Sequence, residues 1–362
     1  MGQPVGQTAG RSVGLRDEIL EQPAAARRQL ADHDGDGALA AIAAEVRAPD
    51  IDAVVIAARG SSDHAAIYAQ YAFGIRNRLA VALAAPSITS LYGVEPRLER
   101  ALVVGISQSG ASPDIVGVVE AARRQAAPTV AITNDPGSPL GTAAEHVLEL
   151  RAGPELAVAA TKTYTTSLLA IARLSAALAG EGPDSAAAAE LSAIPDAIER
   201  ALEVEAEVAA LARVMAATDR CVVLGRGFEY ATAREWALKL KELARVFADP
   251  YSAADFQHGP LALVEPGVPI LAVLPDGPAA AGLASLVQGL HRDHGAEAVV
   301  LSDSAALRAL GSRSIALPAG VPDWLRPIVS IVPAQLFAYH LTLARGLDPE
   351  APRHIQKVTR TR

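Results

Sequence analysis

The chain of 362 residues contains a single cysteine, four lysines and only 4% aromatic residues. One cysteine excludes an intrachain disulfide and a metal cluster held by cysteines. Cys221 stands in an apolar run, which indicates a buried structural thiol. No uninterrupted apolar run approaches the roughly 20 residues that a membrane helix needs. The first 14 residues also lack the basic start and apolar centre of a signal peptide, so we expect a cytoplasmic protein without a membrane partner.

Positive charge is scarce as well, since the formal net charge is −8. No Lys/Arg cluster is long enough to follow a phosphate backbone, so we expect no nucleic-acid partner. An anionic small molecule would have to be held by local dipoles. The 28 arginines supply nearly all cations, whereas lysine, unlike arginine, can lose its proton or form a Schiff base. The few lysines therefore mark positions to examine for chemistry: Lys162, Lys239, Lys241 and Lys357.

The chain repeats itself once. Residues 52–60 (DAVVIAARG) are echoed by residues 219–227 (DRCVVLGRG), an offset of 167 residues that is typical of a duplicated domain. In each half, short β-branched apolar runs alternate with Ala-rich helical stretches, which is typical of a parallel sheet covered on both faces. The predicted fold is therefore α/β, with two tandem doubly wound parallel-sheet lobes of the flavodoxin-like type, related by internal duplication.

The same patterns place the elements along the chain. The predicted strands span 53–57, 79–83, 101–106, 129–133 and 146–150 in the first half, and 220–224, 269–274, 297–301 and 314–317 in the second. Long helices are expected at 16–32, 188–217 and 326–345. The predicted organisation is an N-terminal tail and helix (1–45), a first lobe (46–200), a second lobe (201–345) and a C-terminal tail (346–362).

Two short motifs imitate known sites without completing them. Residues 32–37 (DHDGDG) resemble the start of an EF-hand loop, but Ala43 stands where a bidentate carboxylate is required, so we predict a turn. Gly225 and Gly227 begin a dinucleotide fingerprint, but Tyr230 replaces its third glycine. The eight histidines show no zinc-ligand spacing. We therefore expect no metal and no cofactor.

One loop carries a stronger signal. The apolar run 102–106 leads directly into Ser107-Gln108-Ser109-Gly110-Ala111-Ser112, and Pro113 then opens a helix at the position where proline is tolerated. A strand end that delivers hydroxyls and free N–H groups at a helix N-terminus is a phosphate site by geometry. The end of the first strand, Gly60-Ser61-Ser62, would face the same pocket. The alternative is that these serines only cap helices.

These loops resemble the sugar isomerase (SIS) domain family. From about Asp17 to Val358, the chain is similar to the isomerase half of glucosamine-6-phosphate synthases. The matching motifs occur in the family's order: 18–23 (EILEQP), 59–62 (RGSS), 107–110 (SQSG), 160–166 (ATKTYTT), 237–242 (ALKLKE), 258–263 (HGPLAL) and 352–357 (PRHIQK). The resemblance implies that Gly60, Ser61, Ser62, Ser107, Gln108, Ser109 and Ser112 hold a sugar phosphate.

The resemblance also implies catalytic roles in the second half. Lys239 and Glu242 are three residues apart on a predicted helix and project from one face. Glu242 would move a proton between C1 and C2 of the open-chain sugar, and His258 would open the ring. Lys357 would meet the sugar carbonyl from a flap. The alternatives are that Glu235 and Lys239 form a solvated salt-bridge stripe and that His258 is incidental.

In that family the histidine is contributed to the neighbouring subunit's site. The resemblance therefore implies a homodimer in which His258 is shared across the interface.

The sequence departs from the synthases in ways that affect the expected reaction. We expect no counterpart of their glutaminase domain, and Ala111 replaces an acidic residue, Ala160 replaces a serine and His354 replaces an amide. We therefore expect an isomerase-type deaminase that converts an aminohexose 6-phosphate, such as glucosamine 6-phosphate, into fructose 6-phosphate and ammonia. The alternatives are a fructosamine-6-phosphate deglycase, a related ketose/aldose phosphate isomerase, and a non-catalytic sugar-phosphate-binding regulator.

Overall fold

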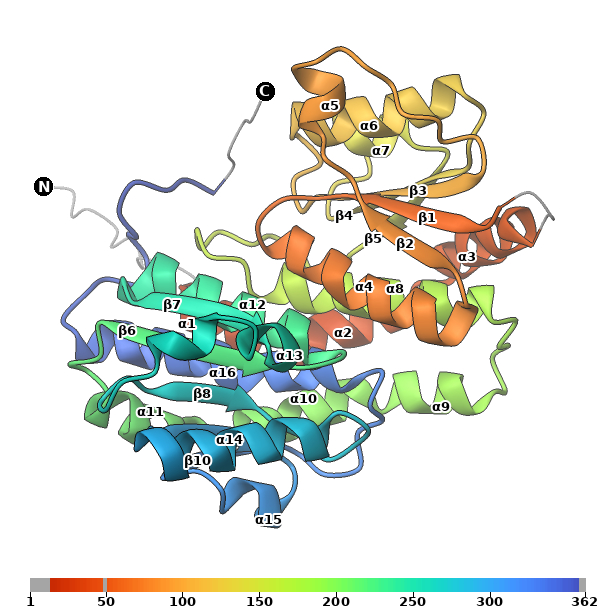
Figure 1. Ribbon diagram of the computed structural model, residues 1–362. Coiled ribbons are helices and arrows are strands. Elements are labelled where there is room, and N and C mark those ends of the chain that lie inside the picture. The colour runs from red at the N-terminus through yellow and green to blue at the C-terminus, as the bar shows by residue number, and fades with distance from the viewer. Residues whose placement is uncertain (1–13, 48–50, 358–362) are drawn as a thin grey trace, which may run out of the picture.

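The computed structural model describes residues 14–47 and 51–357, and it shows two α/β lobes, each built on a five-stranded parallel sheet (Figure 1). The first sheet has the order β2-β1-β3-β4-β5 and the second β10-β9-β8-β6-β7. Read from the other edge, the second order is β7-β6-β8-β9-β10, which repeats the first. The strands are β1 Ala53–Ala57, β2 Ala80–Leu83, β3 Ala101–Ile106, β4 Thr129–Thr133, β5 His146–Glu149, β6 Arg220–Gly225, β7 Phe247–Ser252, β8 Ile270–Val273, β9 Ala298–Ser302 and β10 Arg313–Ala316.

Helices follow the strands in both halves of the chain. The first lobe and the segment before it contain α1 Leu15–Leu20, α2 Gln22–Leu30, α3 His33–Val46, α4 Ser61–Asn77, α5 Ser87–Ser90, α6 Pro113–Arg124, α7 Pro139–Ala143 and α8 Lys162–Leu178. The remainder contains α9 Ala186–Ser192, α10 Ile194–Leu202, α11 Glu205–Val214, α12 Glu229–Lys239, α13 Ala253–Phe256, α14 Ala280–His294, α15 Ala305–Arg308 and α16 Arg326–Ala344. A π-helical turn, Leu240–Ala244, continues α12, and a 3-10 turn spans Pro260–Leu263.

The predicted fold class is confirmed, and each of the nine predicted strands matches an observed strand to within one residue at either end. The central strands β3, β4 and β8 are buried along their whole length. Their continuous apolar sequences therefore reflect burial on both faces, as expected for parallel sheets.

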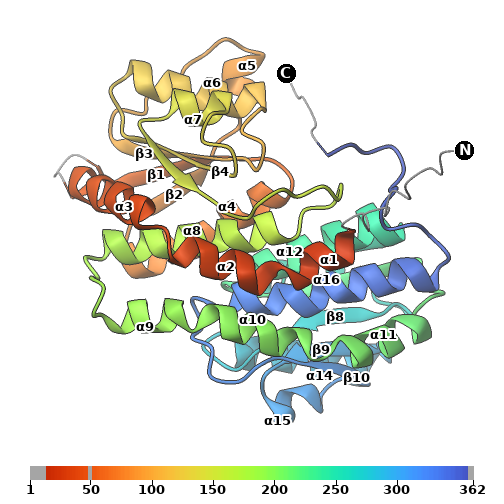
Figure 2. The same ribbon diagram turned by 180° about the vertical axis from the view of Figure 1, so that it is seen from behind.

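The two lobes share one hydrophobic core. A single cluster of buried side chains runs from Ile56 and Val104 of the first sheet, through Trp236, to Val223 and Leu271 of the second sheet. Figures 1 and 2 show the helices that carry it, with α4 and α8 on one side of the lobe boundary and α12 and α16 on the other. Separate clusters cover the outer face of each sheet. Because the central core is continuous, each lobe helps to position the other.

The edge strand β7 was not predicted. It contains Asp249 and Pro250, and Phe247 at its start is largely exposed. Proline lacks the N–H that a central strand needs and is confined to edges, where one side of the strand faces no partner. The strand pairs only with β6 in the sheet. As an edge strand, β7 needs hydrogen bonds to one neighbouring strand only, so it tolerates residues that are unusual in central strands.

Three other predictions about local structure were wrong. Residues 32–37 do not form a turn but lead into α3, where Asp36 pairs with Arg173 of α8 at 2.7 Å. The helix predicted over 188–217 is three helices, α9, α10 and α11. The helix predicted over 16–32 is divided into α1 and α2 at Glu21. These segments pack against neighbouring helices, α3 against α8 and α10 against α2 and α16, and local pattern does not encode such contacts. Residues 1–13 and 358–362 of the predicted tails lie outside the described residues.

The helix α16 is long and apolar enough to cross a membrane by length and composition alone. It lies instead inside the protein, with 78% of its most apolar window buried. It packs against α10, α11 and α12, and its Phe337 meets Trp236 edge to face at 5.6 Å between ring centroids. A helix that is apolar on all sides is therefore the central support of the second lobe.

Glu229, at the start of α12, is buried and accepts hydrogen bonds from Thr232 (2.5 Å) and Ser330 (2.7 Å). Burial, the largest influence, raises its pKa from 4.5 to about 7. The folded chain therefore binds this proton more tightly than the unfolded chain does. The resulting stability is fully present below about pH 4.5 and is lost as the pH rises through about 7.

We predict that the free energy of unfolding falls by up to about 3 kcal/mol between pH 5 and 8 because Glu229 must lose its proton. Glu229→Gln should remove this part of the pH dependence. Urea denaturation at several pH values measures it, with the exposed Glu265→Gln as a matched control. Parallel stability curves for the wild type and Glu229→Gln would contradict the assignment.

Candidate active site

The serine-rich loop between β3 and α6 is shaped by Gly110. This glycine has a φ of +59°, and a Cβ added to it would lie 1.9 Å from Ser138 Oγ. Its N–H donates to Ser107, and its carbonyl accepts from the N–H of Leu140 at 3.0 Å. The Ser109 hydroxyl accepts from the N–H of Ala111 at 3.3 Å. The loop therefore folds back tightly at the carboxyl edge of the sheet, where ligands bind in open α/β proteins.

The loop after β1 lies beside the serine-rich loop. Arg59 joins the two, since its guanidinium binds Asp114 in the first turn of α6 at 3.0 Å. Within residues 14–47 and 51–357, the side chains of Ser62, Gln108 and Ser112 hydrogen-bond to no other residue, although all three are half-buried. Ser112 is the N-cap of α6, yet its hydroxyl does not cap the helix. Simple helix capping therefore does not account for these polar groups.

Ser61 faces a different partner. Its hydroxyl donates to Glu235 Oε1 at 2.8 Å, and Glu235 belongs to α12 of the second lobe. The Nδ1 atom of His64, one turn further along α4, lies 2.7 Å from Glu235 Oε2. Ser61 and His64 therefore connect the start of α4 to the second lobe, while Gly60, with a φ of +57°, forms the turn before them.

Glu235 belongs to a buried group of charges. Lys239 lies one turn further along α12, with its Nζ 3.3 Å from Glu235 Oε1 and 2.6 Å from Glu242 Oε2. The side chains of Glu235 and Lys239 are 0% and 1% exposed, and that of Glu242 is 22% exposed. The group is therefore an interior network with one carboxylate that reaches solvent, and the interpretation of a solvated salt-bridge stripe is wrong.

The network fixes the charge of its members. Burial is the largest influence on Glu235 and acts to raise its pKa, but the charge of Lys239 and contacts with His64 and Ser61 hold the pKa below its usual value. Burial acts to lower the pKa of Lys239, but the two carboxylates outweigh it and raise this pKa. The two carboxylates therefore favour the ammonium form of Lys239. It is unsuited to act as a nucleophile, which requires the neutral amine.

Glu242 lies in the π-helical turn that ends α12. The turn runs from Leu240 to Ala244 and closes with Arg245 at a φ of +55°. Single π-helical turns are frequent at functional sites, because the extra residue redirects a side chain away from its regular helical position. Here Glu242, in the turn, forms an ion pair with Lys239, three residues before it.

Lys357 lies on a second buried carboxylate. Its Nζ is 2.5 Å from Glu155 Oε2, in the loop between β5 and α8. Glu155 also accepts from the N–H groups of Thr161 and Thr163, each at 3.0 Å, at the start of α8. Burial, the largest influence, acts to raise the pKa of Glu155, but Lys357 and these donors lower it. The C-terminal tail is therefore fastened to the first lobe by its only lysine.

His258 stands apart from these groups. It follows β7 and α13, and its residue is exposed. In the described part of the chain its side chain makes no hydrogen bond or ion pair with another residue. The structure thus brings Lys239 and Glu242 together, links Ser61 to them, and leaves His258 on the surface.

Two acidic residues of this region were missed as site candidates. Glu155 carries no motif signal of its own, and Glu21 is part of the 18–23 motif without a predicted role of its own. Both bind lysines, Glu21 taking Lys162 at 2.7 Å. The lysine scarcity was the signal that could have found them, because a lysine buried in the interior requires a carboxylate partner. Lys241, in contrast, is exposed.

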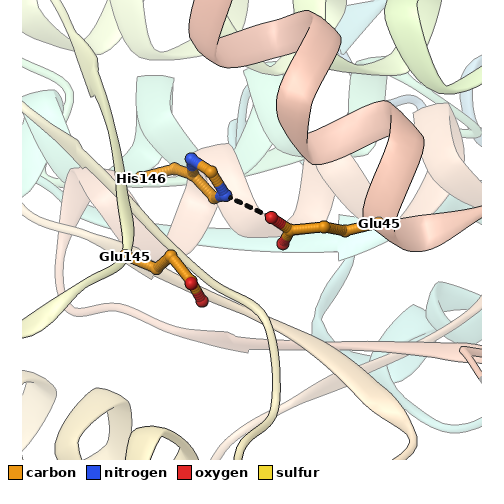
Figure 3. Close-up of side chains that lie close together, drawn as sticks. All are labelled: Glu45, Glu145 and His146. Atoms are coloured by element: carbon orange, nitrogen blue, oxygen red, sulfur yellow. Dashed lines mark hydrogen bonds and ion pairs between the residues drawn. The ribbon is translucent and has the colours of Figure 1, made fainter.

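Two other features lie away from this site. An open pocket of about 830 Å³ is lined by α2, α3, α8, α9 and α10, and none of the predicted site residues lines it. Figure 3 shows a surface cluster of Glu45, Glu145 and His146, in which His146 Nε2 is 3.0 Å from Glu45. Glu145 pairs instead with Arg123 at 2.7 Å. Ion pairs account for this cluster, and we assign no metal to it.

Comparison with known proteins agrees with the two-lobed arrangement. The SIS domain family model matches residues 50–177 and 215–345. The glutamine–fructose-6-phosphate aminotransferase (isomerizing) of Methanothermobacter thermautotrophicus is 37% identical over 348 residues, covering 94% of this chain and 56% of that protein. The chain therefore spans about half the length of the curated relatives it matches.

Solved structures agree with that match. A protein of Silicibacter pomeroyi DSS-3, described as a candidate phosphosugar isomerase, has a TM-score of 0.82 at 37% identity, covering 92% of this chain and 99% of that one. The C-terminal domain of glucosamine-fructose-6-phosphate aminotransferase from Francisella tularensis has a TM-score of 0.83 at 28% identity, covering 95% and 99%.

We predict that Gly110→Ala destabilises the chain by about 2–4 kcal/mol, because the new Cβ adds a steric clash to an unfavourable φ. Gly93→Ala is the matched control. Its φ is +65°, but nothing lies within 4 Å of the added Cβ, so it should cost only about 1 kcal/mol. Urea denaturation compares the two, and equal losses would show that Ser138 does not constrain the loop.

Proposed function

The chain belongs to the SIS domain family, and we propose that it is a sugar-phosphate isomerase-type enzyme that deaminates an aminohexose 6-phosphate. The observation that carries this proposal is the Glu242 carboxylate. It is the one member of the Glu235–Lys239–Glu242 network that reaches solvent, and a buried ammonium holds it in place. A carboxylate so positioned can exchange protons with a bound substrate.

The phosphate of the substrate would bind at the loops that follow β1 and β3. Gly60, Ser62, Ser107, Gln108, Ser109 and Ser112 surround the starts of α4 and α6. Ser62, Gln108 and Ser112 have hydrogen-bonding capacity that the described residues do not use. Two helix N-termini add favourable dipoles for an anion. These contacts would hold the phosphate whatever the sugar, so they give affinity and orientation.

The chemical step follows from the position of Glu242. In the open-chain aminoaldose, Glu242 would take the proton from C2 and return one to C1, which leaves a C=N bond at C2. Water then adds to that carbon, ammonia leaves, and the products are fructose 6-phosphate and ammonia. Lys357 can exchange its amine with the imine nitrogen, because such exchange conserves the C=N bond. It must first leave Glu155 and lose its proton.

The single cysteine within these 362 residues lies in the second lobe. Cys221 is buried in β6, and burial raises the pKa of its thiol to about 12. A thiol with such a pKa does not supply the thiolate that a cysteine nucleophile needs. These 362 residues therefore contain no cysteine suited to hydrolyse glutamine.

Incubation of the purified protein with glucosamine 6-phosphate should release ammonia and fructose 6-phosphate in equal amounts. Glu242→Gln keeps the shape of the side chain but cannot accept a proton, so we predict that kcat falls by about 100-fold or more. Coupled assays for both products measure the reaction.

The matched variant for the second step is Lys357→Arg. It retains a cation for Glu155 but cannot form an imine, so kcat should fall while the tail keeps its protection from proteolysis. Ammonia release that is equal in the wild type and in Glu242→Gln would contradict the deaminase proposal. Release of a free amino acid from a fructosamine 6-phosphate adduct would point to the deglycase instead. Stabilisation by sugar phosphates without turnover would point to a regulator.

We also propose that two chains form a dimer in which each supplies His258 to the site of the other. The supporting observation is that His258 is exposed and contacts neither Glu242 nor any other described side chain through a hydrogen bond or ion pair. An imidazole shared across the interface would complete the ring-opening step in the partner's site.

Coexpression of His258→Ala and Glu242→Gln chains with different tags tests the shared site. Each variant alone should be inactive. In a mixed dimer one site regains both residues, so an equal mixture should recover on the order of a quarter of wild-type activity. Recovery at the background level, in dimers shown to carry both tags, would place His258 in the site of its own chain.

A further inference from the structure

Glu235 binds side chains of both lobes. From the first lobe it receives the Ser61 hydroxyl at 2.8 Å and the His64 Nδ1 at 2.7 Å. Both residues lie in the first turn and a half of α4, directly after Gly60. From the second lobe it receives Lys239 at 3.3 Å. One carboxylate therefore joins the helix that begins at the proposed phosphate site to the helix that carries the proposed proton-transfer residue.

The burial of these groups makes the link specific. Glu235 and Lys239 are almost wholly excluded from solvent, and the His64 side chain is only 9% exposed. A buried charge without partners is strongly unfavourable, so each group is confined to the position where its partners are. A surface pair of the same composition would exchange partners with water and would transmit little.

The position of the Lys239 ammonium depends on Glu235. Its ammonium lies between two carboxylates, and the shorter contact, 2.6 Å, is with Glu242. Without Glu235, the ammonium would have a single partner and would be free to follow Glu242 toward solvent. Glu242 would then lose its defined distance from the substrate, and misplacement of about 1 Å can cost about 100-fold in rate.

We propose that Glu235 is a positioning residue that holds Glu242 in place through Lys239, and that Ser61 and His64 make this position depend on the first lobe. The inference rests on the proposed function, because it deepens the role of the same site. Ser61 thereby acts on Glu235 rather than on phosphate, which departs from its expected role as a substrate-binding residue.

The first test is kinetic and uses Glu235→Gln, which retains size and removes charge. With glucosamine 6-phosphate, kcat should fall by roughly 10- to 100-fold while KM stays within about threefold, because phosphate binding is not touched. In the Glu242→Gln background, the same change should cost less than about threefold, since its target is already lost.

The matched control is Glu229→Gln. Glu229 is also a fully buried glutamate of α12 with two hydroxyl donors, but it has no contact with Lys239. This variant should leave kcat within about twofold of wild type. If Glu229→Gln and Glu235→Gln lower kcat equally, the effect is general destabilisation of α12 and the proposal fails.

A second test does not depend on catalysis. Because the chain has four lysines, protein labelled with 13C-lysine gives few Cε signals, which single Lys→Arg variants assign. Glu235→Gln and Ser61→Ala should both shift the Lys239 signal and leave that of Lys162 unchanged. An unshifted Lys239 signal in Ser61→Ala would overturn the link between lobes. Absence of turnover in wild-type protein, with the Lys239 shifts present, would refute the proposed function but not the link.

Discussion

The structure depends on one constraint, namely that the charges buried between the lobes must be compensated there. Glu235 and Lys239 have no solvent, so their hydrogen-bond partners have to be supplied by the protein. The second lobe supplies Glu242, and the first lobe supplies Ser61 and His64. Removal of either lobe would leave unpaired charge in an apolar core that includes Trp236 and Tyr164. The hydrophobic core brings the lobes together, and this polar group favours the relative position in which its donors and acceptors are satisfied.

Because the two lobes are duplicates, equivalent positions can be compared to see how the lobes differ. At the offset of 167 residues, Ser62 corresponds to Glu229, and Ser109 corresponds to Asp276. Where the first lobe offers hydroxyls, the second has carboxylates, which repel an anion. Arg326 of α16 occupies this edge of the second lobe and donates to the carbonyl of Asp276. In the second lobe, the loop that corresponds to the serine-rich loop is therefore held by a side chain of the same lobe. The first lobe keeps its hydroxyls at this edge, and the second lobe carries Lys239 and Glu242.

The parts of the fold that sequence predicted are those in which local pattern and burial agree. Central strands such as β3 and β8 are apolar along their whole length because both faces are covered, so a short apolar run predicts them well. The edge strand β7 and the breaks between α9, α10 and α11 depend on neighbours distant in sequence, and local pattern contains no record of those neighbours. The site follows the same rule. The spacing of Lys239 and Glu242 predicted their contact, because both lie on one stretch of helix. The contacts of Glu235 with Ser61 and of Lys357 with Glu155 cross more than 170 residues, and only the folded chain brings them together.

The scarcity of lysine acquires a physical meaning in this arrangement. Three of the four lysines bind glutamates: Lys162 binds Glu21, Lys239 binds Glu235 and Glu242, and Lys357 of the tail binds Glu155. Arginine has a wider, planar head that needs several acceptors, whereas an ammonium fits between two carboxylates as a compact charge. Lys239 uses this compactness to hold two glutamates, one about a helical turn before it and one about a turn after it. Lys357 uses another property, since a tail lysine that leaves its carboxylate can lose its proton and an arginine cannot. Lysine therefore has two uses in this chain. The buried Lys239 is a fixed charge between two carboxylates, whereas Lys357, on a tail without helix or strand, is available for chemistry.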